Sequence, residues 1–219
     1  MSTETTSPQS ISTFAGASVG GYLDDLAAKI PAPGGGAVAA LHAAQGAALV
    51  AMVARYTTRA KDVAHREVVD RIIAAADAAR TRSLALADAD AAAFTAVGAA
   101  YKLPKDTDEQ AAARTAAVTA ALLEAARVPA AVVAEADEVL SLAADLLPIG
   151  NPNVITDIGA AADAARAAAT SSQLNIAINV ASLADGEGAE FAGALRTIEE
   201  IVARADALHT DVVTAVTTR

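Results

Sequence analysis

Two carboxylates, Asp88 and Asp90, stand in an alanine-rich segment, and helical spacing predicts different chemistry for them. Asp90 continues an apolar stripe with steps of three or four residues, formed by Ile72, Ala76, Ala79, Ser83, Leu86, Phe94, Val97 and Tyr101. Asp88 is rotated from Asp90 by roughly 200° and is expected to face solvent. A carboxylate on a core-facing stripe costs several kcal/mol of desolvation unless it is paired or used in chemistry. Asp90 is therefore the candidate acid or base, and a structural carboxylate paired with a buried arginine or a backbone N–H is the alternative.

A glycine-rich turn supplies the second chemical feature. Two prolines, Pro31 and Pro33, hold the chain extended before Gly34, Gly35 and Gly36, and a strong helix-forming sequence follows at once. The unpaired N–H groups of a helix's first turn can receive an anion or a polarised oxygen. Gly-Lys-Ser/Thr is absent, so the turn is not a Walker phosphate loop. A turn that only starts a helix is the alternative.

Positive charge is scarce and clustered. Arg55, Arg59 and Lys61 follow the end of the expected helix, where they suit either a basic helix cap or an anionic ligand. Asn175 and Asn179 lie among branched apolar residues, and buried amides need partners. A hydrogen-bonded pair between helices and a ligand contact both remain open for them.

A second turn, residues 148–153, contains Asn151 and Asn153 and precedes Asp157. Asp157 opens the helix that also carries Asn179. The two residues are separated by 22 positions, hence by about 33 Å at 1.5 Å per residue, so they cannot contact one reacting atom in the same subunit.

The elements that must position these residues are all helical. We expect a short helix over residues 19–29 and long helices over 36–57, 62–101 and 108–146. A fifth helix carries Asp157 to Asn179, and a final helix runs from residue 189 to the C-terminus. Residues 1–18 are expected to form a flexible tail and residues 19–219 a single all-α domain. Alanine faces bury little area each, so this bundle is expected to associate as a two-fold homodimer.

Composition narrows the function classes. The net charge of -10 and the pI near 4.7 argue against a nucleic-acid partner, because phosphate binding needs a basic surface. There is no cysteine, and the three histidines form no metal motif. Residues 30–54 carry no charge, but prolines, glycines, His42 and Gln45 favour a core helix over a membrane span. No secretory signal is recognisable at the N-terminus, so a cytoplasmic protein without a membrane partner is expected.

Five motifs, in order, resemble the formiminotransferase-cyclodeaminase C-terminal family, which includes bacterial methenyltetrahydrofolate cyclohydrolases. They are the segments 31–36 with the helix that follows, 88–94, 103–105, 150–157 and 174–179. The match departs from the family pattern at Ala37, at Arg55-Tyr56-Thr57 and at Thr156, and the basic run after the first long helix is reduced to Arg59 and Lys61. The resemblance covers nearly the whole chain and implies an all-helical, folate-binding homodimer.

The resemblance also implies a reaction. Hydrolysis of 5,10-methenyltetrahydrofolate to 10-formyltetrahydrofolate needs one carboxylate, first as base and then as acid, and no metal or cofactor beyond the tetrahydrofolate substrate. Asp90 is the first candidate and Asp157 the second. By resemblance, the turn Pro33–Gly36 would meet folate oxygens, Arg55, Arg59 and Lys61 the glutamate, and Asn175 and Asn179 the pterin. Asn151 and Asn153, in the motif before Asp157, are further candidate substrate contacts. Formimidoyltetrahydrofolate cyclodeaminase activity and a non-catalytic helical scaffold are the alternatives.

Overall fold

The computed structural model describes residues 13–218, apart from the side chain of Lys61. The main helices are α1 (Val19–Ala27), α2 (Gly35–Arg55), α3 (Arg66–Tyr101), α4 (Asp108–Leu146), α5 (Thr156–Val180) and α6 (Ala192–Thr217). Short 3-10 turns are η1 (Phe14–Gly16), η2 (Ala60–His65), η3 (Pro152–Val154) and η4 (Ala189–Phe191). No strand occurs within these described residues. The prediction of five long helices and a short leading helix is confirmed.

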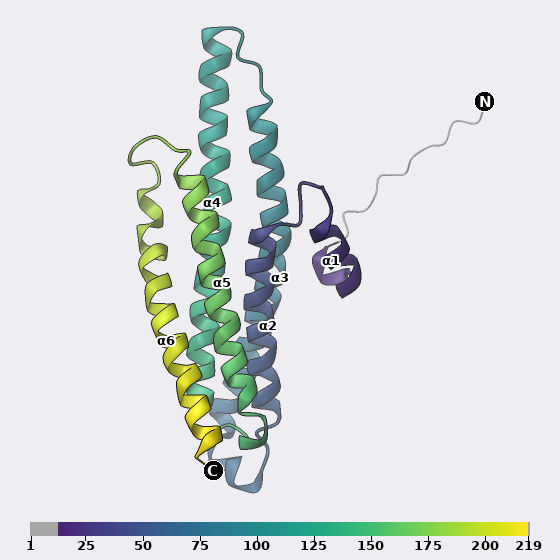
Figure 1. Cartoon of the computed structure of the whole chain (residues 1–219), viewed down its shortest axis with the longest axis vertical. Helices are drawn as coiled ribbons and strands as arrows, with labels where there is room; N and C mark the ends of the chain where they lie inside the picture. The colour runs from purple at the N-terminus through teal and green to yellow at the C-terminus, as the bar shows by residue number, and fades with distance from the viewer. Residues whose placement is uncertain (1–12, 219) are drawn as a thin grey trace, which may run out of the picture.

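The five long helices run side by side along the long axis of the molecule (Figure 1). α2 packs against α3 and α5, α4 packs against the same two helices, and α6 covers α5 and part of α4. The upper ends of α3 and α4 extend beyond the other helices, and α1 stands to one side (Figure 1). The bundle therefore has two distinct ends, joined by helices that run its length.

Alanine dominates the core. Ala39, Ala40, Ala43 and Ala47 of α2 are fully buried, and so are alanines of α3, α4 and α5. Small side chains let helix backbones approach closely: a Cβ on Gly46 would lie 3.0 Å from Val139 Cγ1 and 3.2 Å from the carbonyl oxygen of Ala161. Larger buried side chains, such as Ile72, Leu140 and Ile158, fill the wider layers.

The helix ends follow from local sequence. Thr107 caps α4, because its hydroxyl accepts a hydrogen bond from the N–H of Gln110 at 3.2 Å. Pro129 lies inside α4, and the helix continues through it. The expected start of the third helix at residue 62 differs from the structure, since the chain forms η2 there before α3 begins at Arg66.

The N-terminal segment is attached to α3. The backbone N–H of Phe14 donates to Asp88 Oδ1 at 2.9 Å, and the Phe14 ring makes an edge-to-face contact with Tyr22 at 5.7 Å between centroids. The expectation that Asp88 faces open solvent is therefore wrong, because this half-buried carboxylate receives the chain from η1. Of the expected tail, residues 1–12 lie outside the described part, and Phe14–Gly16 form a helical turn.

Three segments of the described chain are long and apolar enough to cross a membrane by length and hydropathy alone: Gly35–Arg55, Asp62–Tyr101 and Asp108–Leu146. Alanine accounts for much of this hydropathy. In the bundle, 61% of the most apolar window of Gly35–Arg55 is buried against other helices. The expectation of no membrane partner stays a prediction.

Candidate active site

The glycine turn brings the first residues of α2 against Asp90 of α3. A Cβ on Gly36 would lie 1.9 Å from Asp90 Oδ1, so any side chain there would displace the carboxylate or the helix. None of the three glycines has a positive φ, and Gly34 is extended at -144°. The turn therefore needs glycine at position 36 for space. A Cβ on Gly35 would instead meet Asn175 at an ordinary 3.7 Å.

Asp90 occupies the position of an anion at the N-terminus of α2. The helix cap, Gly34, has no side chain, and the backbone N–H of Ala37 donates to the Asp90 carboxylate. Burial raises the pKa of Asp90 above its ordinary value, and the hydrogen bond from Ala37 opposes that rise. The sequence predicts that N–H groups in the first turn of α2 can bind an anion, and in the structure the Asp90 carboxylate binds one of them, that of Ala37. Asp90 is half-buried, which leaves it open to the pocket described next.

A pocket of about 260 Å³ opens beside Asp90. It is lined by residues from the turn, α3, α4 and α5: Pro31, Ala32, Gly34, Gly35, Gly36, Asp90, Ala93, Phe94, Val97, Ala125, Asn175, Ile178 and Asn179. The structure thus brings together the glycine turn, Asp90 and the two asparagines, which are far apart in the sequence. Pro33 is buried within the same turn, where it follows a cis peptide bond.

The two asparagines present acceptor oxygens. Asn175 Nδ2 donates to the carbonyl of Ser171 at 2.8 Å, and Asn179 Nδ2 donates to the carbonyls of Asn175 at 2.8 Å and Ala125 at 3.2 Å. Their Oδ1 atoms accept no hydrogen bond from the part of the chain that the structure describes. The bond to Ala125 is the helix-to-helix contact expected as one alternative. The free oxygens make both side chains able to accept hydrogen bonds from a ligand.

Tyr22 is a further residue near Asp90 that the sequence analysis does not identify as a candidate site residue. Its hydroxyl is buried without a hydrogen-bond partner in the described structure. Burial and the nearby negative charge of Asp90 both raise the pKa of Tyr22. Nothing in the spacing of the 19–27 segment singles this tyrosine out, because its approach to Asp90 is a contact between distant segments, beside the contacts of Phe14 with Asp88 and with the Tyr22 ring.

The remaining candidates lie at the opposite end of the bundle. Arg55 ends α2, 20 residues from Gly35 and so about 30 Å away, and it pairs with Asp77. Arg59 is bound by Asp62 at 2.7 Å and donates to the carbonyl of Gly150 at 3.1 Å. Lys61 belongs to η2, beside them in the chain, and its side chain is outside the description.

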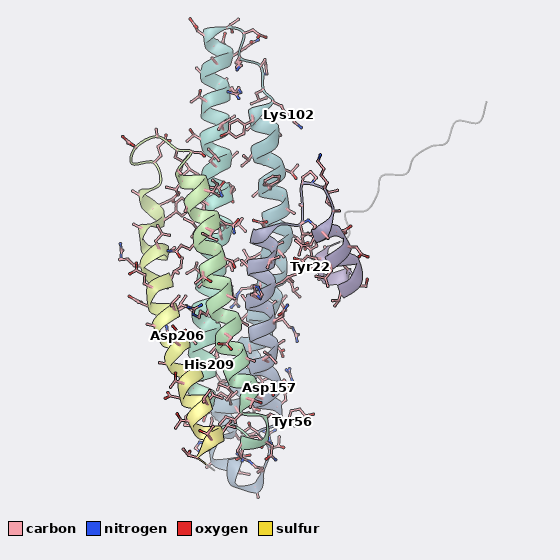
Figure 2. All side chains as sticks on the ribbon, viewed as in Figure 1. Tyr22, Tyr56, Lys102, Asp157, Asp206 and His209 are labelled. Carbon is pink, nitrogen blue, oxygen red and sulfur yellow. The ribbon has the colours of Figure 1, made fainter. Side chains whose placement is uncertain are left out.

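The turn before α5 joins the same end. Asn151 donates to the carbonyl of Tyr56 at 2.8 Å and accepts from the N–H of Asn153 at 3.1 Å. Asp157 lies in the first turn of α5, near Tyr56 and far from Tyr22 (Figure 2). A single chain therefore does not bring Asp157, Asn151, Asn153, Arg55 or Arg59 to the Asp90 pocket.

The fold and this site define the class of protein: an all-α bundle in which a half-buried carboxylate, that of Asp90, contacts a glycine turn. The family model for formiminotransferase-cyclodeaminase matches residues 18–200, and the chain belongs to that family.

Relatives of two kinds are similar to it. The methenyltetrahydrofolate cyclohydrolase of Methylorubrum extorquens is 39% identical over 189 residues, covering 86% of this chain and 90% of the relative. The formimidoyltransferase-cyclodeaminase of Rattus norvegicus is 34% identical over 170 residues, 77% of this chain but only 31% of that longer protein. The crystal structure of formiminotetrahydrofolate cyclodeaminase from Thermotoga maritima superposes with a TM-score of 0.77 at 28% identity, covering 91% of this chain and 95% of that one.

Proposed function

We propose that this protein hydrolyses 5,10-methenyltetrahydrofolate to 10-formyltetrahydrofolate. The observation that carries the proposal is the Asp90 carboxylate, half-buried with a raised pKa at the edge of a pocket that also presents two amide oxygens. The similarity to the Methylorubrum cyclohydrolase over most of both chains supports this substrate.

The reaction needs a single group that first accepts and then returns a proton. Asp90 takes a proton from water as the water oxygen bonds to the amidinium carbon between N5 and N10. The bond from that carbon to N5 then breaks as N5 receives the proton from Asp90. The added hydroxyl group releases its proton to solvent and becomes the carbonyl oxygen of the formyl group, which stays on N10. The negative form of Asp90 also stabilises the cationic substrate, and burial brings its pKa closer to neutral pH. No metal or second cofactor takes part in this scheme.

The pocket also suits the pterin. The edge of the pterin ring carries amino and N–H donors, which match the acceptor oxygens of Asn175 and Asn179. Gly35 and Gly36, in the first turn of α2, line the same pocket, and N–H groups of a first turn have no partner within their own helix.

A second candidate is formimidoyltetrahydrofolate cyclodeaminase, which acts at the same folate carbon but releases ammonia. The structural similarity to the Thermotoga cyclodeaminase favours it. Two assays on the purified protein separate the candidates: loss of methenyl absorbance, corrected for spontaneous hydrolysis, and ammonia release from 5-formiminotetrahydrofolate. A non-catalytic scaffold would show neither activity and no saturable binding of a reduced folate.

The proposal includes a homodimer in the cytoplasm. Leu174 and Ile178 on α5 are 72% and 67% exposed beside the pocket. An apolar surface of this kind is stabilised when a second copy covers it. A monomeric mass in solution at micromolar concentration would exclude the dimer.

A further inference from the structure

A second hollow continues from the Asp90 pocket along α3. It measures about 550 Å³ and is lined by Pro31, Phe94, Thr95, Gly98, Ala99, Lys102, Leu103 and Pro104. Pro31 and Phe94 line both hollows. The two hollows therefore adjoin at these residues, and the second hollow, from Phe94 to Lys102, is here called the arm groove.

The arm groove has an open, apolar floor. Its α3 residues lie on one helical face, because they follow each other by one, three or four positions. An added Cβ on Gly98 would meet no heavy atom within 4 Å, so the floor is free of neighbouring side chains there. Phe94 presents an exposed aromatic ring at the entrance. This surface fits a flat aromatic group lying along the helix.

The far end of the arm groove carries a positive charge. Lys102, the residue after α3, lines the hollow and is exposed, and it forms no ion pair with a carboxylate in the described part of the chain. Most described arginines do form such pairs, among them Arg55, Arg59, Arg66, Arg71, Arg80, Arg82, Arg127, Arg166 and Arg204. In a chain with a net charge of -10, an available cation at the end of an apolar groove is well placed to attract an anionic group.

The groove also has the required length. Lys102 lies 12 positions after Asp90 and directly follows the last residue of α3, which corresponds to about 18 Å at 1.5 Å per residue. Figure 2 shows Lys102 high on α3, well above the level of Tyr22. A ligand with its reacting carbon at Asp90 must therefore be elongated to reach Lys102.

We propose that the arm groove binds the benzoylglutamate arm of the substrate, with the benzoyl ring along Phe94 and a glutamate carboxylate at Lys102. This inference rests on the proposed function, because the reacting end of the folate is placed at Asp90. It assigns the anionic end of the substrate to Lys102 instead of the distant Arg55, Arg59 and Lys61.

The test compares two substrates on the parent and on Lys102→Ala: 5,10-methenyltetrahydrofolate and 5,10-methenyltetrahydropteroate, which lacks the glutamate. Lys102→Ala should raise KM for the glutamate-bearing substrate about five- to tenfold with kcat unchanged, since uniform binding is removed. KM for the pteroate should stay within twofold of the parent, about the error of such a comparison. Lys102→Arg should bring KM for the glutamate-bearing substrate most of the way back to the parent value. Added salt should reduce the effect of Lys102→Ala on that KM.

Arg196→Ala on α6 is the matched control, because it removes one exposed positive charge from outside the groove. It should not change the ratio of the two KM values. Equal effects of Lys102→Ala on both substrates, or no effect on either, would overturn the inference. Binding of 5-formyltetrahydrofolate and 5-formyltetrahydropteroate is measured on the same proteins, so Lys102 is tested even if turnover is absent and the proposed reaction fails.

Discussion

Polar side chains lie at both ends of the bundle, but they differ in whether other groups of the protein bind them. At the α2 C-terminus, Arg59 is bound by Asp62 and by backbone carbonyls, and Asn151 links Tyr56 to Asn153. At the α2 N-terminus, Asp90 has a raised pKa, the Tyr22 hydroxyl is buried without a partner in the described structure, and two asparagine oxygens face a pocket. Arg59 and Asn151 at one end are hydrogen-bonded within the protein, whereas the polar groups named at the other end are left available.

This difference separates structural from functional use of polar residues. Hydrogen bonds at the Arg59 end close the turn between α4 and α5 onto η2, which stabilises the connection. Groups at the Asp90 end carry the cost of burial without full pairing, as is typical of sites that bind or react. The contrast therefore ranks Asp90 above Asp157 as the catalytic carboxylate.

The sharpest test of the contrast is Asp90→Asn. Asparagine keeps the volume and loses the titrating charge, so turnover should fall by ~10² to 10⁴ with little change in folate affinity. Melting temperature at neutral pH should be maintained or raised, because a costly buried charge is removed. Methenyltetrahydrofolate hydrolysis, corrected for the spontaneous rate, is the measurement. Near-parental turnover would remove Asp90 from the chemistry.

Gly36→Ala should have the next largest effect. The new methyl group would overlap Asp90 Oδ1, so the carboxylate or the start of α2 must move, and misplacement by about 1 Å can cost on the order of 10²-fold in turnover. Gly35→Ala is the matched control, since its Cβ would meet Asn175 at an ordinary 3.7 Å and alanine favours the helix. Equal losses in the two variants would argue that the whole turn is structural.

The raised pKa of Asp90 predicts an acid limb in the turnover profile. Since the carboxylate form is the base, kcat should fall by up to about tenfold per pH unit as pH drops through that pKa, and Asp90→Asn should lack this limb. Stability should change in the opposite direction. The folded-state pKa lies above the unfolded value, so the parent gains stability relative to Asp90→Asn as pH falls through the raised pKa. Denaturant unfolding of both proteins across this range measures the difference, and a parent that loses stability there would contradict the assigned shift.

The smallest effect is expected at the other end. Asp157→Asn should leave turnover within a few-fold of the parent, because Asp157 lies at the opposite end of the bundle from the Asp90 pocket. The same assay measures it. A loss of turnover as large as that of Asp90→Asn would contradict the distinction between the two ends of the bundle. In a dimer, it would mean that Asp157 of the second copy completes the Asp90 pocket.

The sequence was most informative where a single helix decides the outcome. Three- and four-residue spacing places Ile72, Ala76 and Ala79 in the core and turns Asp90 inward. It failed for Phe94 and Tyr101 on the same stripe, which are exposed because α3 extends past the bundle. Periodicity gives a direction around the helix, whereas exposure depends on how far the neighbouring helices reach.

Contacts between distant segments were harder to predict. The role of Gly36 depends on which α3 side chain meets the turn, and that of Asp88 on the returning N-terminal segment. Arg59 resembles a ligand-binding cation in sequence, but its carbonyl partners lie about 90 residues away, as the separations of 90 and 91 show. Such pairings are fixed by tertiary packing, which spacing along one segment does not encode.

The alanine core has a consequence for how stability depends on temperature. Each buried methyl group exposes little apolar area on unfolding, while the helices release as many peptide groups as those of any helical protein. Apolar exposure raises the heat capacity and polar exposure lowers it, so the change per residue should fall below the usual ~12–15 cal/mol/K. The free energy of unfolding then varies slowly with temperature, and the enzyme would keep similar stability across a broad range, with cold denaturation displaced to lower temperatures.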